Sequence, residues 1–345
     1  MRRVALVVAL VGVVGCGIFK KSDDGAEAPP PAAQSEGALA TKGAAAAAHG
    51  IAAAPSASSS TGAPATPAAG TTTLDTHAIE EATGLTGAVM PDGVFRITRP
   101  RGDLKVTLDG FPITPRMGLA GWIGFRAHPS GAVLVGVLPV AADELQVVVS
   151  ALANAGLEST ALHAHFVGEE PRVAFVHFAG IGNAIALARG VRDVQDAIVR
   201  VRTAHPLKAP ATESAYDLDA AKLDAALGTH GEHEGGVYRV TIPRTDVRVS
   251  DLGADLGPTM SPTSWAAFEG TAERAAVAGE IMALPTEVEP VIHALRDAHI
   301  GVVGIHDNSS REDPRLAFVS FWGVGKSDAL AAGLRKALDQ LPHGG

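Results

Sequence analysis

An internal duplication constrains the fold of this chain more than any other feature of its sequence. The segment 171–192 returns as 314–335 at an offset of 143 residues, and thirteen of its 22 residues are identical in the second copy. The same offset aligns 93–98 with 236–241. Agreement at so many separated positions predicts two modules of one fold, at 74–205 and 213–343, and a length of 345 residues suits two domains.

Each copy contains apolar segments in the same order. A strand opens the copy, an apolar run ended by Pro139 or Pro285 follows, and then comes a helix with apolar residues at i, i+3, i+4 and i+7. Two strands joined by a polar turn and a final helix complete it. The predicted segments of the first copy are strands at 94–98, 104–108, 132–138, 157–165 and 172–178, a helix from Leu145 to Gly156, and a helix from Asn183. This order predicts an α+β fold of two tandem homologous modules, each an antiparallel or mixed sheet with helices on one face.

The first sixteen residues have the pattern of a bacterial export signal. Arg2 and Arg3 precede an unbroken apolar run at 4–14, which is too short to span a bilayer and suits the core of a signal peptide. The run leads to Cys16 in a sequence similar to a lipobox, in which the cysteine is acylated and becomes the N-terminus. We therefore expect a signal peptide at 1–15 and a lipid anchor on Cys16. The alternatives are a secreted protein with an incidental cysteine and an uncleaved anchor.

A linker is expected between this anchor and the first module. Alanine, proline, serine, threonine and glycine dominate 17–73 without an amphipathic period, so we expect 16–73 to comprise the lipidated cysteine and a disordered tether. Gly17 follows Cys16 at the position where an inner-membrane retention signal would have aspartate. We therefore expect a membrane-anchored protein of the cell envelope, sorted to the outer membrane where the host has one.

Charge and cysteine content argue against several functional classes. The net charge is −9 and no cluster of Lys and Arg occurs, so nucleic acid is not an expected partner, because phosphate neutralisation supplies most of that affinity. Cys16 is the only cysteine, which leaves the modules without a disulfide or a thiolate nucleophile. The segment 320–327 resembles the end of a phosphate loop, but Ser320 replaces the required first glycine, and no nucleotide is expected.

Histidines in the first copy form the main candidate site. If the last two strands make a hairpin centred near Glu169, residues whose numbers sum to about 338 face each other. His163 then lies opposite Phe175, and His177 is its diagonal neighbour on the same face. His163 and His165 also share a face, because alternate residues of a strand point the same way. Neutral imidazoles bind Zn²⁺ or a similar divalent metal, and Glu169 in the turn is a further candidate ligand.

The second copy keeps only part of this set. His306, Asn308 and Ser320 stand at the equivalent positions, so the first histidine alone is retained. Two interpretations remain open. Either the first module carries a site for a ligand or metal, or the histidines form a hydrogen-bonded cluster with a structural role.

Several of these residues also occur in a known pattern. The chain resembles the LppY/LpqO lipoprotein family over nearly all of 74–343, in the run Ala161–His165, the sequence Glu169–Arg172, His177 with Phe178, and 187–190. That resemblance implies an envelope location and a duplicated domain, and it implies no established activity. The expected function is ligand or partner binding, or a structural role, in the envelope. The alternative is a metal-dependent hydrolase that uses the histidine cluster of the first module.

Overall fold

The computed structural model describes residues 73–207 and 216–342. The expected signal peptide, Cys16 and the linker up to residue 72 lie outside the described residues.

The two modules contain the same elements in the same order. Module 1 consists of α1 (Thr76–Thr83), β1 (Ala88–Val89), β2 (Phe95–Pro100), β5 (Ala120–His128), β6 (Gly131–Ala141), α2 (Leu145–Asn154), β7 (Glu158–His163), β8 (Val173–Gly182) and α3 (Ala184–Ala204). Module 2 consists of α4 (Ala220–Leu227), β9 (Glu232–Glu234), β10 (Val237–Ile242), β13 (Ser264–Gly270), β14 (Ala275–Ala283), α6 (Val288–Asp297), β15 (Gly301–His306), β16 (Ala317–Gly325) and α7 (Ser327–Leu338).

Each module is built on one six-stranded sheet. The strand order is β1-β2-β5-β6-β8-β7 in module 1 and β9-β10-β13-β14-β16-β15 in module 2, and neighbouring strands are antiparallel. The two orders are the same topology. The prediction of a duplicated α+β fold is therefore confirmed, with an antiparallel sheet in both copies.

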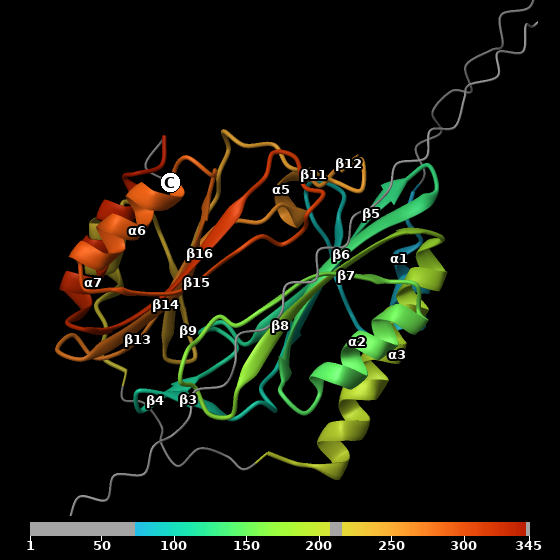
Figure 1. The fold of residues 1–345 in the computed structure, drawn as a ribbon, viewed down its shortest axis with the longest axis horizontal. Helices are drawn as coiled ribbons and strands as arrows, with labels where there is room; N and C mark the ends of the chain where they lie inside the picture. The colour runs from blue at the N-terminus through green and yellow to red at the C-terminus, as the bar shows by residue number, and fades with distance from the viewer. Residues whose placement is uncertain (1–72, 208–215, 343–345) are drawn as a thin grey trace, which may run out of the picture. The chain divides into compact units, whose positions relative to one another are not determined.

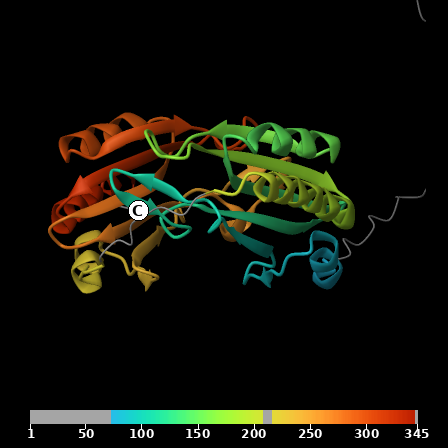
Figure 2. The same cartoon turned by 90° about the horizontal axis from the view of Figure 1, so that it is seen from below.

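Helices cover one face of each sheet, the face turned away from the other module (Figure 1, Figure 2). In module 1 this packing buries Ile79 of α1, Val148 of α2 and Val191 of α3 against Phe178 and other strand residues. An equivalent core in module 2 contains Phe321. Burial of these apolar side chains is the main term that fixes the helices on their sheets.

The opposite faces of the two sheets meet through two long insertions between strands, which we call excursions. Between β2 and β5 the chain forms the hairpin β3 (Val106–Leu108) and β4 (Phe111–Ile113), which shares a buried cluster with β14 and with Trp322 of β16. Between β10 and β13 it forms β11 (Ser250–Asp251), β12 (Ala254–Asp255) and α5 (Gly257–Met260). This second excursion packs on Val133 of β6 in module 1. Each module thus covers part of the other one's sheet.

Several sequence expectations need correction. The apolar run of module 1 continues through Pro139 to Ala141, because β6 pairs only with β8 beyond Val137, and a strand with one free side tolerates a proline that lacks its N–H. Three helices and seven strands were not predicted: α1, α4, α5, β1, β4, β5, β9, β11, β12 and β13. The segment 104–108 belongs to the excursion instead of the main sheet, and the predicted strand 157–165 ends at His163.

Candidate metal and ligand site

The candidate site lies where the inner faces of the two sheets meet. Both modules contribute to it. His163 ends β7, His177 lies in β8, and His165 follows β7. From module 2 come His306, which ends β15, and Glu280 of β14.

Strand register explains how the side chains of His163 and His177 come together. In module 1, His163 pairs with Phe175 and Ala161 pairs with His177, which is the register predicted from the sequence. The connection between β7 and β8 is longer than the expected short turn, since β8 begins at Val173. The same register in module 2 pairs His306 with Phe318. The last residue of β7 and the last residue of β15 are therefore equivalent histidines.

The imidazoles of the two modules are in direct contact. The rings of His163 and His306 stack with centroids 3.4 Å apart and planes inclined by 16°. The Nε2 atoms of His163 and His177 are 2.9 Å apart, and the centroids of His163 and His165 are 4.9 Å apart. Ring nitrogens of His163, His165 and His306 all lie within 4.8 Å of one another. We call His163, His165, His177, His306 and Glu280 the histidine cluster.

Glu280 is the carboxylate of this cluster. Its Oε1 atom lies 2.7 Å from Nε2 of His306 and 3.5 Å from Nε2 of His165, and it accepts a hydrogen bond from the Ser320 hydroxyl at 3.1 Å. Its Oε2 atom accepts from the indole N–H of Trp265 at 3.3 Å. These contacts with His306, His165, Ser320 and Trp265 hold the carboxylate in one orientation inside the protein.

Burial favours uncharged imidazoles here. Desolvation, followed by repulsion from the other histidines, lowers the pKa of His163 to about 2. Desolvation also lowers the pKa of His177 to about 3 and that of His165 to about 4, although Glu280 opposes both shifts. Desolvation alone would raise the pKa of Glu280, but His165 and His306 outweigh it and the pKa falls below its usual range. Near neutral pH, His163, His165 and His177 are therefore unprotonated beside a buried anion.

The structure brings His163, His165 and His177 together, as the register argument expected, but the cluster does not belong to module 1 alone. That expectation was wrong because His306 and Glu280 complete it from module 2. The sequence contains a feature that could have identified Glu280. It is the acidic residue among the small and apolar residues of β14, and module 1 has Val137 at the equivalent position. Position 320 of module 2 has serine where module 1 has His177.

Glu169 does not join the cluster. Its side chain is buried, and its Oε1 atom accepts a hydrogen bond from the backbone N–H of Val173 at 3.1 Å, at the start of β8. Within the described ranges, Glu169 forms no hydrogen bond or ion pair with a histidine. Its recurrence as Glu312 in the second copy is explained by this turn, since the carboxylate of Glu312 bonds the backbone of Leu316, the equivalent of Val173. The expected role of Glu169 as a ligand is therefore not supported.

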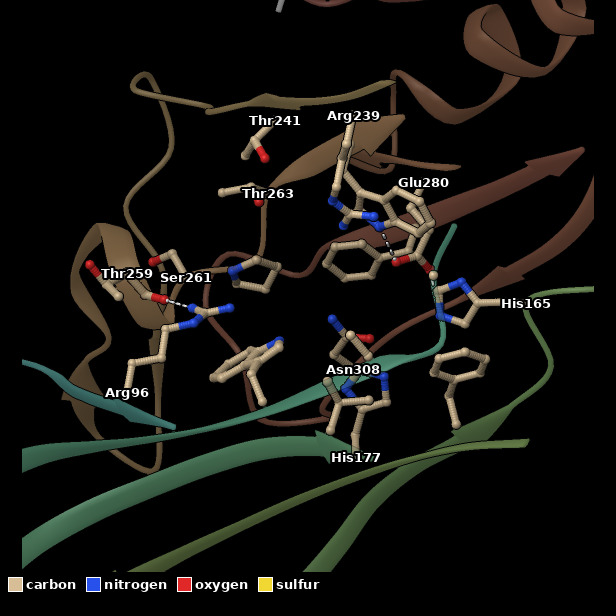
Figure 3. A pocket seen from close by; sticks show the side chains of 18 of the residues that line it. Arg96, His165, His177, Arg239, Thr241, Thr259, Ser261, Thr263, Glu280 and Asn308 are labelled. Carbon is tan, nitrogen blue, oxygen red and sulfur yellow. Dashed lines mark hydrogen bonds and ion pairs between the residues drawn. The ribbon is translucent and has the colours of Figure 1, made fainter. Parts of the chain in front are cut away.

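A cavity of about 440 Å³ adjoins the cluster between the two modules (Figure 3). His165, His177 and Glu280 form one part of its wall. Helix α5 and the loop that follows it in module 2 form another part with the hydroxyl-bearing side chains Thr259, Ser261 and Thr263. Further lining residues are aromatic or apolar: Met90, Trp122, Val137, Phe175, Trp265 and Phe318.

Two arginine–tryptophan pairs also line the cavity, one from each module. The guanidinium of Arg96 lies 4.3 Å from the ring centroid of Trp122, and that of Arg239 lies 4.1 Å from the ring of Trp265. The offset of 143 residues relates the two pairs. The cavity therefore has equivalent walls on its two sides and a histidine cluster between them that draws on both copies.

Comparisons with solved structures give weak likenesses. A trimeric bacterial microcompartment shell protein, PduB, is 14% identical over 76% of this chain and 95% of that chain, with a TM-score of 0.19. EtuB from Clostridium kluyveri is 11% identical over 75% of this chain and 90% of that chain, with a TM-score of 0.19. TM-scores of this size do not show a shared fold. No curated protein matches the chain.

The membrane and family comparisons complete the description. No helix among the described residues is long and apolar enough to cross a membrane. A family profile described as Domain of Unknown Function (DUF1259) matches residues 77–197 and again residues 221–340. These segments coincide with the two modules and together cover most of the chain, so the protein belongs to this family and carries its domain twice.

Proposed function

We propose that the protein is an exported envelope lipoprotein that binds one divalent metal ion at a site shared by its two modules. One observation carries the metal site: ring nitrogens of His163, His165 and His306 lie within 4.8 Å of one another, next to the buried carboxylate of Glu280. Residues from both copies are needed to assemble this set. The duplication itself thus builds the site.

Charge balance supports a cation at this place. Glu280 is a buried carboxylate beside His163, His165 and His177, whose pKa values are lowered by burial, and a cation bound among these side chains would compensate the carboxylate charge in a poorly solvated region. Imidazole and carboxylate ligands suit Zn²⁺ and neighbouring transition metals more than Mg²⁺ or Ca²⁺. We therefore expect Zn²⁺ or a similar ion.

Metal analysis of the full chain tests this proposal. After exposure to Zn²⁺ and gel filtration, the wild type should retain one ion per chain. His163→Ala and His306→Ala should each weaken binding at least tenfold, because each removes one ligand. The control is His293→Ala, an exposed histidine of α6, which should bind as the wild type does. Equal metal content in all four proteins would refute the shared site.

The envelope location is supported by the sequence of residues 1–16. Signal cleavage before Cys16 and acylation of its thiol and amino group would anchor both modules to a membrane through lipid. Mass spectrometry of the mature N-terminus should find an acylated cysteine, and Cys16→Ser should remain unacylated. A mature wild-type chain that starts elsewhere, or that keeps a free cysteine, would contradict this part of the proposal.

Hydrolysis by the bound metal is a second candidate function. The observation in its favour is that the cavity reaches His165, His177 and Glu280, so an ion at the cluster would have a side open to a substrate and to water. Zn²⁺-loaded protein should then hydrolyse simple ester or phosphoester probes, and His163→Ala should abolish that activity. Stoichiometric metal without hydrolysis of any such probe would leave binding as the function.

A further inference from the structure

Two arginines line the cavity, and acidic groups act on them through space: Asp92 acts on Arg96, and Glu280 and Glu232 act on Arg239. Within the described part of the chain, neither Arg96 nor Arg239 forms an ion pair, and each guanidinium donates to one backbone carbonyl only. Arg96 donates to the carbonyl of Thr259, and Arg239 donates to the carbonyl of Arg116 at 2.8 Å. A guanidinium has five N–H donors, so most donors of both groups remain available to a ligand.

Both guanidinium groups are also held in place. Each guanidinium carbon lies over a tryptophan ring, and the hydrogen bond to a backbone carbonyl further restricts the movement of the group. Desolvation, with repulsion from Arg116, lowers the pKa of Arg239 to about 10, so the group is still protonated near pH 7. A fixed, desolvated guanidinium recognises a carboxylate or phosphate in bidentate fashion and loses little entropy on binding.

The chemistry around the arginines suggests the kind of ligand. The cavity volume of about 440 Å³ lies in the range of small-molecule sites. Threonine and serine hydroxyls line one side, and aromatic rings line much of the remainder. We propose that this cavity binds a small organic anion with two acidic groups, one held by Arg96 and the other by Arg239, with its carbon skeleton against the aromatic walls.

This inference extends the proposed function, since the cavity ends at the histidine cluster, but the anion contacts do not require the metal. Trp265 links the two regions, because its ring supports Arg239 while its indole N–H donates to Glu280. An acidic group bound at Arg239 would therefore lie on the side of the cavity nearest the cluster. The two acidic groups are carboxylates or phosphates, which share the same recognition by arginine.

Calorimetric titration of the full chain tests the proposal with four probes. Glutarate carries two carboxylates and 3-phosphoglycerate carries a carboxylate and a phosphate, whereas acetate and inorganic phosphate each carry one acidic group. At least one of the two-acid probes should bind with a Kd at least a hundredfold lower than either single-acid probe. The ratio of glutarate to 3-phosphoglycerate affinity then assigns the acid type. Absence of saturable binding by both two-acid probes would overturn the proposal.

Substitutions locate the binding. Arg96→Gln and Arg239→Gln should each lower the affinity for the tighter-binding probe at least tenfold. Arg96→Lys and Arg239→Lys should lower it less, because lysine keeps the positive charge but not the planar guanidinium group. The matched control is Arg274→Gln. Arg274 stacks on Phe111 at 4.4 Å and donates to the carbonyl of Asp109 at 2.9 Å, but it does not line the cavity. Equal affinity in the wild type and both Arg96 and Arg239 variants would also overturn the proposal.

Metal and anion binding can be separated. The titrations are run on chelator-treated protein and repeated with Zn²⁺. Arg96→Gln should lose the anion and keep the ion, whereas His163→Ala should lose the ion and keep anion binding in the metal-free protein. If His163→Ala retains the metal, the proposed metal function fails while the anion result stands. If anions bind only to metal-loaded protein, and substitution of Arg96 and Arg239 leaves their affinity unchanged, the present inference fails while the metal function stands.

Discussion

At the scale of single residues, the duplication has preserved a buried ion pair in each module. Arg101 donates to both oxygens of Glu144, at 3.0 and 2.7 Å, and both side chains are almost completely buried. Arg244 and Glu287 form the equivalent pair in module 2. The carboxylate of Glu144 also accepts from the backbone N–H of Ala141 at 2.8 Å, which ties the end of β6 to the start of α2.

Breaking this pair should be expensive. Glu144→Gln removes the buried negative charge that Arg101 and Arg202 share, and it leaves Asp103 as the remaining carboxylate partner of Arg101, which costs on the order of 3 kcal/mol. Urea unfolding of the full chain measures the change. The control is Asp196→Asn, which breaks the exposed pair of Arg192 and Asp196 and should cost less than about 1 kcal/mol. Similar losses in the two variants would contradict the special role of burial.

Glu312 gives a second prediction at this scale, through pH. Desolvation, with repulsion from Asp251 and Asp307, raises its pKa to about 7 in the folded protein, against 4.5 for the free side chain. The folded state therefore prefers the protonated form. The stability that the protonated carboxyl group contributes is complete below pH 4.5 and is lost as the pH rises from 4.5 through 7. Glu312→Gln should thus stabilise the protein at pH 8, by on the order of 1–3 kcal/mol, and change little at pH 4.

Unfolding midpoints at pH 4, 6 and 8 check this prediction. Glu289→Gln, at an exposed glutamate of α6, controls for the loss of one charge. A Glu312→Gln variant that is less stable than the wild type at pH 8 would show that the ionised carboxylate makes a favourable contact there.

At the scale of elements, periodic and β-branched segments were predictable and the others were not. The strands now seen as β6 and β8 contain enough valine, leucine and phenylalanine to be recognised from sequence alone. β13 reads Ser-Trp-Ala-Ala-Phe-Glu-Gly, without one β-branched residue, and β5 has only Ile123. Those two strands form because they pair on both sides, which local propensity does not reveal.

Glycines in two equivalent strands show how closely the elements pack. A Cβ atom added at Gly136 of β6 would lie 2.6 Å from the ring of Phe178 and 3.0 Å from the carbonyl oxygen of Trp122. Gly279 of β14 stands in the same relation to Phe321 and Trp265. In both modules a phenylalanine of the next strand thus lies over a glycine, and this contact sets how that ring packs under the helices.

Gly136→Ala and Gly279→Ala should therefore each destabilise the protein by about 1–3 kcal/mol, because the phenylalanine ring and the backbone of the neighbouring strand must both shift. Gly102→Ala is the control, since a Cβ atom there meets nothing within 4 Å. Thermal unfolding of the three variants makes the comparison. Unfolding temperatures of the Gly136 and Gly279 variants equal to that of the control would contradict the proposed close packing.

At the scale of the whole molecule, the site depends on contact between the copies. Hairpin register within module 1 was enough to predict that His163, His165 and His177 approach one another. The participation of His306 and Glu280 was not predictable, because it depends on how two sheets far apart in sequence face each other. The excursions that join those sheets contain little regular structure, so no periodic pattern in the sequence could predict how they pack.

A separated module should therefore lose the site. The segment 73–207 alone lacks His306 and Glu280, and the apolar cluster around β3 and β4 loses its partners in module 2. We expect this fragment to bind an apolar dye more strongly than the full chain and to retain no stoichiometric Zn²⁺. Dye fluorescence checks the first expectation, and metal analysis after gel filtration checks the second. Retention of one ion per fragment would place the site in module 1 alone.

The central claim is one metal centre made by both modules, and anomalous diffraction from crystals of the Zn²⁺-loaded protein tests it most directly. A metal centre shared by the two modules should give one strong anomalous peak at the histidine cluster, with nitrogens of His163, His165 and His306 at about 2.0–2.1 Å from it. Absence of a peak there, or a peak bound only by residues of module 1, would contradict it.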